Sequence, residues 1–160
     1  MQINDAGRLP AGKHRCSLDD MESLFVKRAP HSEHRASLLT SFKEWHKAIL
    51  ELVPDHTLWI DGGFVTYKDE PPRDIDVVVV ARNRDSLNSL KAEEQAKLQA
   101  LLTHVAGDDR VIQKPMGGAV DAYIAFRSDS DNTSYWFEFW QGVRGDDTAR
   151  KGFLEVIPSG

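Results

Sequence analysis

The sequence predicts one α/β domain of the α+β type, in which a mixed β-sheet is packed by helices. Its 160 residues are enough for a single core that buries roughly two-thirds of the surface of the unfolded chain. Apolar residues at three- and four-residue spacing predict an amphipathic helix over residues 32–52. The four valines at 77–80 predict a buried strand, because β-branched residues favour strands. Helical and strand patterns therefore occur together in a chain of single-domain length.

The N-terminal part is expected to hold an arm followed by two helices. Residues 1–16 contain two glycines and a proline, so we expect an irregular arm there and a single domain over residues 17–160. Ser17 is the expected N-cap of the first helix, with Asp20 at the capping-box position. The second helix covers residues 32–52, and this N-terminal pair should brace the sheet.

The remaining elements follow from shorter patterns. They are a strand over 58–61, a helical turn from Phe64, a strand over 74–81, a helix over 86–105, a strand over 119–126 and a short strand after Lys151. The aromatic segment 134–143 fits either a buried helix or a strand. Its aromatic residues Tyr135–Trp140 can in principle stack a base, but core packing is the favoured interpretation.

Composition excludes several classes of protein. No apolar stretch approaches the roughly 20 residues that cross a bilayer, and the first residues do not resemble a secretory signal. We therefore expect a cytoplasmic protein with no membrane contact. Cys16 is the single cysteine and has no partner for an internal disulfide. The formal charge of −5 argues against a general polyanion binder.

Two aspartates and two glycines form the most informative segment. Asp74 and Asp76 are two residues apart at the start of a strand, so both carboxylates should project from the same face. Two neighbouring anions require a cation, and oxygen ligands favour a hard ion such as Mg²⁺. Gly62 and Gly63 follow a predicted strand and permit a sharp turn whose N–H groups are free for phosphate oxygens.

This order of features resembles the signature of the polymerase-β-like nucleotidyltransferase superfamily. The signature is a hydrophobic residue, Gly-Gly or Gly-Ser, a gap of about ten residues, and Asp-hydrophobic-Asp. The resemblance covers residues 58–126 and is strongest to small phage and bacterial proteins of the superfamily. It implies a minimal nucleotidyltransferase fold, a helix over 134–143, and a third carboxylate on a later strand, for which Asp121 is the match.

The resemblance also implies a role for each residue of the site. Asp74 and Asp76 would bind two Mg²⁺ or Mn²⁺ ions, and Asp121 would bind the ion nearer the acceptor and help to deprotonate it. The two glycines would offer N–H groups to the β- and γ-phosphates of a nucleoside triphosphate. Because Gly63 stands where serine is commoner, Thr66 is the expected substitute for the missing hydroxyl. Lys68 is a further candidate for contact with the triphosphate.

The implied activity is Mg²⁺-dependent transfer of a nucleoside monophosphate to a hydroxyl of a protein, an RNA or a small molecule. A role in phage–host conflict or in a toxin–antitoxin pair is a hypothesis from the same resemblance. One alternative is a catalytically silent nucleotide- or metal-binding module that acts through a protein partner. Another is a phosphohydrolase that uses the same acids.

Each acid also has a purely structural interpretation. Asp74 and Asp76 could cap turns or pair with Arg73 and Arg82, and Asp121 could be satisfied by a lysine or by backbone N–H groups. The glycine pair could be only a tight turn. Three features in the expected order favour the metal site.

Overall fold

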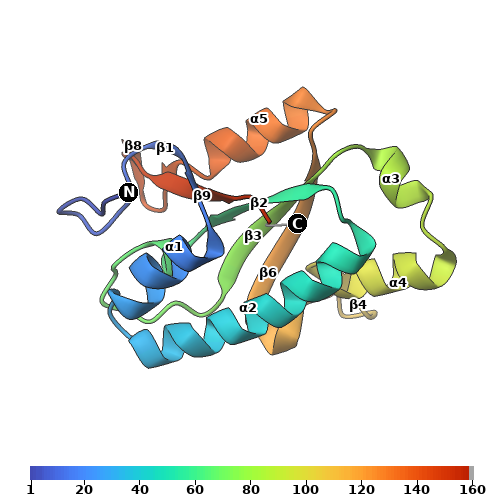
Figure 1. Cartoon of the computed structure of the whole chain (residues 1–160), viewed down its shortest axis with the longest axis horizontal. Coiled ribbons are helices and arrows are strands. Elements are labelled where there is room, and N and C mark those ends of the chain that lie inside the picture. Colours follow the sequence, from blue (N-terminus) through green and yellow to red (C-terminus); the bar gives the residue numbers. More distant parts are fainter. Residues whose placement is uncertain (159–160) are drawn as a thin grey trace.

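Five strands form one mixed sheet in the order β1-β9-β2-β3-β6 (Figure 1). The computed structural model describes residues 1–158. The strands are β1 (Gly12–Cys16), β2 (His56–Asp61), β3 (Ile75–Ala81), β6 (Val120–Phe126) and β9 (Gly152–Val156). Strand β2 runs antiparallel to β3 and β9, whereas β1 pairs with β9 and β3 pairs with β6 in parallel. The predicted α+β class with a mixed sheet is confirmed.

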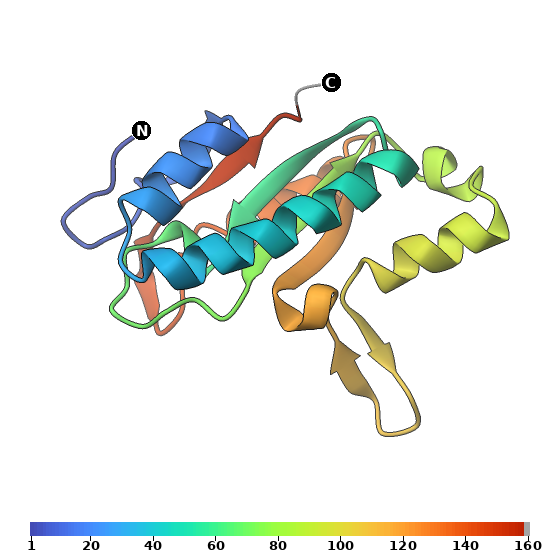
Figure 2. The ribbon, with the colours of Figure 1, turned by 60° about the horizontal axis from the view of Figure 1, so that its bottom comes forward.

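One face of the sheet is covered by the long helix α2 (Ser32–Leu52), which crosses it in Figure 2. Helix α1 (Leu18–Glu22) and the π-helical turn η1 (Ser23–Lys27) precede α2 and complete the N-terminal helical pair. The strands contribute apolar side chains to the core beneath α2: Leu58, Ile60, Ile75, Val77, Val79, Leu154 and Val156. We call this side of the sheet the α2 face.

Helix α5 (Ser130–Phe139) lies on the opposite side, which we call the α5 face (Figure 1). A smaller group of buried side chains packs beneath it: Trp59, Val78, Val80, Ala125, Trp140 and Phe153. Side chains alternate along a strand, so β3 sends Val77 and Val79 to the α2 face and Asp76 and Val78 to the α5 face. Helices therefore cover both faces of the sheet, including the face that carries the acids.

The remaining elements are short. They are α3 (Arg84–Asn88), α4 (Ala92–Ala100), β4 (His104–Ala106), β5 (Val111–Gln113), β7 (Gly142–Val143), β8 (Asp146–Arg150) and the 3-10 turns η2 (Gly63–Val65) and η3 (Met116–Gly118). Strands β4 and β5 form a hairpin that projects from the body of the molecule in Figure 2. Within residues 1–158, no helix is long and apolar enough to cross a membrane.

Several local predictions are confirmed. The Ser17 side chain accepts a hydrogen bond from the Asp20 N–H, and the Asp20 carboxylate accepts one from the Ser17 N–H, as in a capping box. Helix α2 has the predicted bounds, and the aromatic segment begins in α5. The domain boundary predicted at residue 160 includes Ser159 and Gly160, which lie outside the described residues.

Two predictions are wrong because of pairing or capping that periodicity does not reveal. Residues 12–16 of the expected irregular arm form the edge strand β1, which pairs with β9 at the far end of the chain. The helix expected over 86–105 is two helices followed by β4. Asn83 caps the first, and the Glu94 side chain accepts from the Lys91 N–H at the start of the second, so a new helix begins inside the periodic pattern.

Candidate metal centre

Strand register places three aspartates in a row across the sheet. Asp61 of β2 lies opposite Asp76 of β3, and Asp76 lies beside Asp121 of β6. Residues paired in this way project from the same side of a sheet, with Cβ atoms about 5 Å apart. All three therefore point to the α5 face, at the end of the strands where Asp74 immediately precedes β3.

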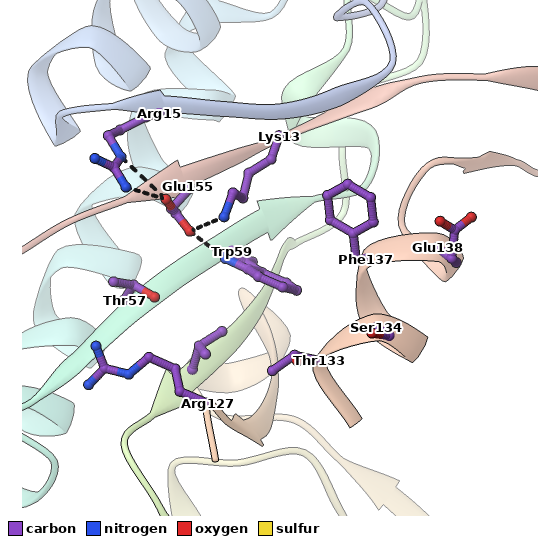
Figure 3. A pocket seen from close by; sticks show the side chains of 11 residues that line it. Lys13, Arg15, Thr57, Trp59, Arg127, Thr133, Ser134, Phe137, Glu138 and Glu155 are labelled. Carbon is purple, nitrogen blue, oxygen red and sulfur yellow. Dashed lines mark hydrogen bonds and ion pairs between the residues drawn. The ribbon is translucent and has the colours of Figure 1, made fainter. Parts of the chain in front are cut away.

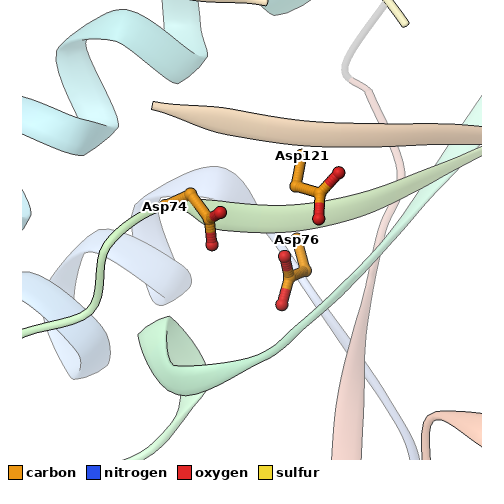
Figure 4. A group of neighbouring side chains, drawn as sticks. All are labelled: Asp74, Asp76 and Asp121. Atoms are coloured by element: carbon orange, nitrogen blue, oxygen red, sulfur yellow. The ribbon is translucent and has the colours of Figure 1, made fainter. Parts of the chain in front are cut away.

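Asp74, Asp76 and Asp121 converge closely enough to share a cation (Figure 4). Each contributes a carboxylate oxygen, and the three oxygens lie within 4.8 Å of one another. Oxygen ligands bind Mg²⁺ or Ca²⁺ at about 2.0–2.6 Å, so two ligands on opposite sides of one ion lie about 4–5 Å apart. The donor set is all oxygen and fits a hard divalent cation.

The electrostatics of the cluster point the same way. Burial, followed by the neighbouring carboxylates of Asp74 and Asp121, raises the pKa of Asp76 to about 8. A partly buried carboxyl among other carboxyls is unfavourable in its ionised form unless a cation compensates it. The fit of these residues to Mg²⁺ thus rests on both geometry and charge.

One lysine partly compensates the cluster. The Lys114 Nζ lies 2.9 Å from Asp74 Oδ2 and 3.7 Å from Asp121 Oδ2. Lys114 comes from the loop between β5 and η3. The Thr103 hydroxyl donates to Asp121 Oδ1 at 2.7 Å and accepts from the Ala122 N–H at 2.9 Å, which fixes the Asp121 side chain.

A second lysine compensates Asp61 at the end of the row. The Lys151 ammonium donates to the Asp61 carboxylate, which is buried, and the Lys151 side chain is partly buried. Burial raises the pKa of Asp61 to about 6, and Lys151 opposes this rise. Sequence reasoning missed Asp61 and Lys151, although Asp61 directly precedes the glycine pair. Their meeting depends on how β2 and the segment before β9 come together.

The glycine turn packs directly against Asp76. Gly62 has φ +80°, a conformation that side chains rarely adopt, and a Cβ there would overlap the Asp76 carboxylate. Its N–H lies beside the Asp61 carboxylate and lowers the pKa of that group. Gly63 begins η2, and the first N–H groups of a helical turn have no partner within the turn.

A buried arginine holds this turn from the α2 face. Arg35 is fully buried, and its guanidinium donates to four backbone carbonyls rather than to a carboxylate. The acceptors are Phe64 at 2.5 Å, Thr66 at 2.7 Å, Phe25 at 3.0 Å and Gly63 at 3.5 Å. Three of the four lie within four residues after Gly62. Arg35 thus links the helix core to the position of the glycine turn.

The structure separates Thr66 and Lys68, the two other predicted nucleotide contacts. Thr66 is 2 % exposed, and its hydroxyl donates to the Gly63 carbonyl at 2.8 Å. The prediction that it replaces the missing serine is corrected, because its hydroxyl stabilises the turn. Lys68 is exposed, and its charge lowers the pKa of Asp61, so it lies within electrostatic reach of the acids.

A pocket of about 510 Å³ lies beside α5 on the same face but contains none of these acids (Figure 3). Its buried carboxylate, Glu155, accepts from Lys13 at 2.9 Å, from the Trp59 indole at 3.0 Å and from Arg15 at 3.3 Å. Burial alone would raise the pKa of Glu155, but these hydrogen bonds and the Lys13 charge hold it below its ordinary value. Glu155 is compensated within the chain and needs no external cation.

A protein-family comparison places almost the whole chain in one family. Residues 1–157 match the model described as "Family of unknown function (DUF6932)". The chain belongs to the DUF6932 family. No curated protein and no solved structure matches this DUF6932 chain. Inference about its chemistry therefore depends on the site itself.

Proposed function

We propose that this DUF6932 protein is a Mg²⁺-dependent nucleotidyltransferase that uses a nucleoside triphosphate. The observation that carries the proposal is the convergence of Asp74, Asp76 and Asp121 within 4.8 Å, with the Gly62 turn packed against Asp76. A metal-binding cluster beside a tight glycine turn suits a triphosphate, which needs both a cation and backbone donors. The resemblance of residues 60–77 to the superfamily signature gives independent support.

In the proposed reaction, different residues bind the metal, orient the phosphates and accept the proton. Asp74, Asp76 and Asp121 would hold Mg²⁺, which when bound neutralises negative charge and polarises the α-phosphate. Gly63 and Lys68 would orient the β- and γ-phosphates. The acceptor hydroxyl forms a bond to the α-phosphorus, the bond to the bridging oxygen breaks, and pyrophosphate leaves. Asp121 is the candidate to take the hydroxyl proton.

Binding can be tested without knowing the acceptor. We expect calorimetry to show Mg²⁺-dependent binding of non-hydrolysable nucleoside triphosphates to the wild type and its loss in Asp74→Asn/Asp76→Asn. A matched control is Asp108→Asn/Asp109→Asn, which removes two exposed carboxylates from the hairpin loop. The proposal fails if no nucleotide binds with Mg²⁺, or if the two double variants behave alike.

Product analysis then separates transfer from hydrolysis. A nucleoside triphosphate labelled at the α-phosphate should pass its label to an acceptor and release pyrophosphate. Release of inorganic phosphate without a labelled acceptor would instead support the phosphohydrolase.

A catalytically silent binding module is the second candidate. The observation in its favour is the Lys114 ammonium between Asp74 and Asp121, which supplies an internal positive charge where a metal would bind. Such a module would bind nucleotide or metal without turnover. Replacement of Lys114 by methionine should tighten Mg²⁺ binding if the lysine competes with the ion. Unchanged Mg²⁺ affinity would show that the lysine does not block the site.

A further inference from the structure

Four aromatic side chains in contact, three of them exposed and Trp136 half-buried, form a cluster next to the acids, which we call the aromatic surface. It consists of Tyr123 from β6 and Tyr135, Trp136 and Phe139 from α5. Tyr135 and Phe139 are each 60 % exposed, and Tyr123 is 37 % exposed. The core-packing interpretation of this segment is correct for Trp140, which is buried, but wrong for Tyr135 and Phe139. Exposed aromatic groups in mutual contact are typical of a binding surface.

The rings form an ordered array. Tyr135 and Phe139 are one helical turn apart, and their rings are 5.8 Å apart and tilted by only 9°. The Trp136 ring stands edge-on to both, at 79° and 86°. Tyr123 joins the array from the sheet, with its ring 5.2 Å from that of Trp136. The helix thus presents flat ring faces that are available for stacking.

The aromatic surface begins where the acid cluster ends. Tyr123 is two residues beyond Asp121 on β6, so both side chains project to the α5 face about 7 Å apart along the strand. A ligand with phosphates at the acids would extend over these rings.

We propose that the aromatic surface stacks the base of the nucleotide whose phosphates bind at Asp74, Asp76 and Asp121. This inference rests on the proposed function. It adds a binding site for the base, which a nucleotide has and an inorganic polyphosphate lacks. Base stacking on aromatic side chains tolerates all bases, so the surface provides affinity more than base selectivity.

A nucleobase suits the aromatic surface better than a protein does. A stable protein interface buries roughly 800 Å² on each partner, which is more than four rings provide. The neighbouring α5 residues Asp131, Ser134 and Glu138 are exposed and polar. A small planar ligand is covered by the rings alone.

The test compares two ligands that share the phosphates and differ in the base. Calorimetry with Mg²⁺ would use a non-hydrolysable ATP analogue and inorganic tripolyphosphate. The variant is Tyr135→Ala/Phe139→Ala, which changes exposed side chains and should leave the fold intact. The control is Ile157→Ala, which removes a 46 % exposed apolar side chain from a hollow beside α2.

We expect the wild type and the control to bind the ATP analogue more tightly than tripolyphosphate. The aromatic variant should bind the analogue about ten-fold more weakly, equivalent to about 1.4 kcal/mol, with tripolyphosphate affinity unchanged. Equal affinity of the variant and wild type for the analogue would overturn the stacking site while leaving the phosphate site in place. The stacking site would also be overturned if the wild type self-associates, the aromatic variant is monomeric, and the variant keeps the nucleotide affinity of the wild type. If neither ligand binds with Mg²⁺, the proposed function itself fails.

Discussion

On the α2 face, the guanidinium NH₂ groups of Arg35 and the His46–His56 pair find partners inside the chain, whereas on the α5 face four carboxylates lie beside one another. Arg35 donates to four carbonyls, and His46 lies 3.1 Å from His56 through their Nε2 atoms. The aspartates of the α5 face share two lysines, Lys114 and Lys151. Four carboxyl groups share two ammonium groups, so the carboxyls are not fully compensated within the chain.

The same strands therefore contribute to stability on the α2 face and carry the candidate binding site on the α5 face. A buried polar group that makes its hydrogen bonds within the chain stabilises the fold and has no bonding capacity left for a ligand. Glu155 shows that burial on the α5 face does not by itself leave a carboxyl uncompensated, because that carboxylate has three donors of its own. The incomplete compensation is confined to the end of the sheet that carries Asp74, Asp76 and Asp121.

The largest expected effect comes from removing the internal donor on the α2 face. Arg35→Met should lower the free energy of unfolding by about 2–4 kcal/mol, because the carbonyls of Phe64, Thr66 and Phe25 lose their donor. Urea unfolding measures this effect. Lys47→Met, on an exposed part of α2, is the control and should change stability by less than about 0.5 kcal/mol. A loss below about 1 kcal/mol for Arg35→Met would mean that the carbonyls find other donors.

The histidine pair should give the α2 face a defined pH dependence. The Nδ1 of His56 donates to the Val53 carbonyl, so its Nε2 accepts from His46 when both rings are neutral. Burial, followed by the proximity of His56, lowers the pKa of His46 from 6.5 to about 4. The unfolded chain then binds a proton that the folded chain does not.

The free energy of unfolding should therefore not depend on His46 titration above about pH 6.5. It should fall by about 1–3 kcal/mol as the pH is lowered from 6.5 towards 4, because the unfolded chain takes up the proton. Urea unfolding at a series of pH values tests this. His46→Leu should show a flatter profile over the same range, since leucine does not titrate. Parallel profiles for the variant and the wild type would assign the acid sensitivity to other groups.

The smallest expected effect has the opposite sign and concerns the α5 face. In the metal-free protein, Asp76→Asn should raise the free energy of unfolding by about 1 kcal/mol, because it removes a carboxylate from between Asp74 and Asp121. The same variant should lose the stabilisation that Mg²⁺ gives the wild type. Thermal unfolding in EDTA and in excess MgCl₂ measures both, with Asp109→Asn as the control. Destabilisation of Asp76→Asn in EDTA would show that the chain already compensates this carboxylate.

Local patterns were sufficient for much of the fold and for part of the site. Helix α2 is long and strongly periodic, and the valine run leaves little alternative to a buried strand. The two-residue spacing of Asp74 and Asp76 placed both on one face, since alternation is a property of any strand. Gly62 was recognised as a sharp turn because its conformation depends on its own backbone.

By itself, the sequence determined the α+β class, the capping of the first helix, the extent of α2 and the candidate acids, because these depend on neighbours within a few residues. Tertiary structure alone decided that β1 pairs with β9, that Asp61 joins the row of acids and that Lys114 and Lys151 reach it. It also decided that Tyr135 and Phe139 face solvent beside the site, since the exposure of a helical aromatic depends on which side of the helix meets the sheet. Contacts between segments that are distant in the sequence become favourable only when the sheet is assembled. No pattern of neighbouring residues therefore predicts them.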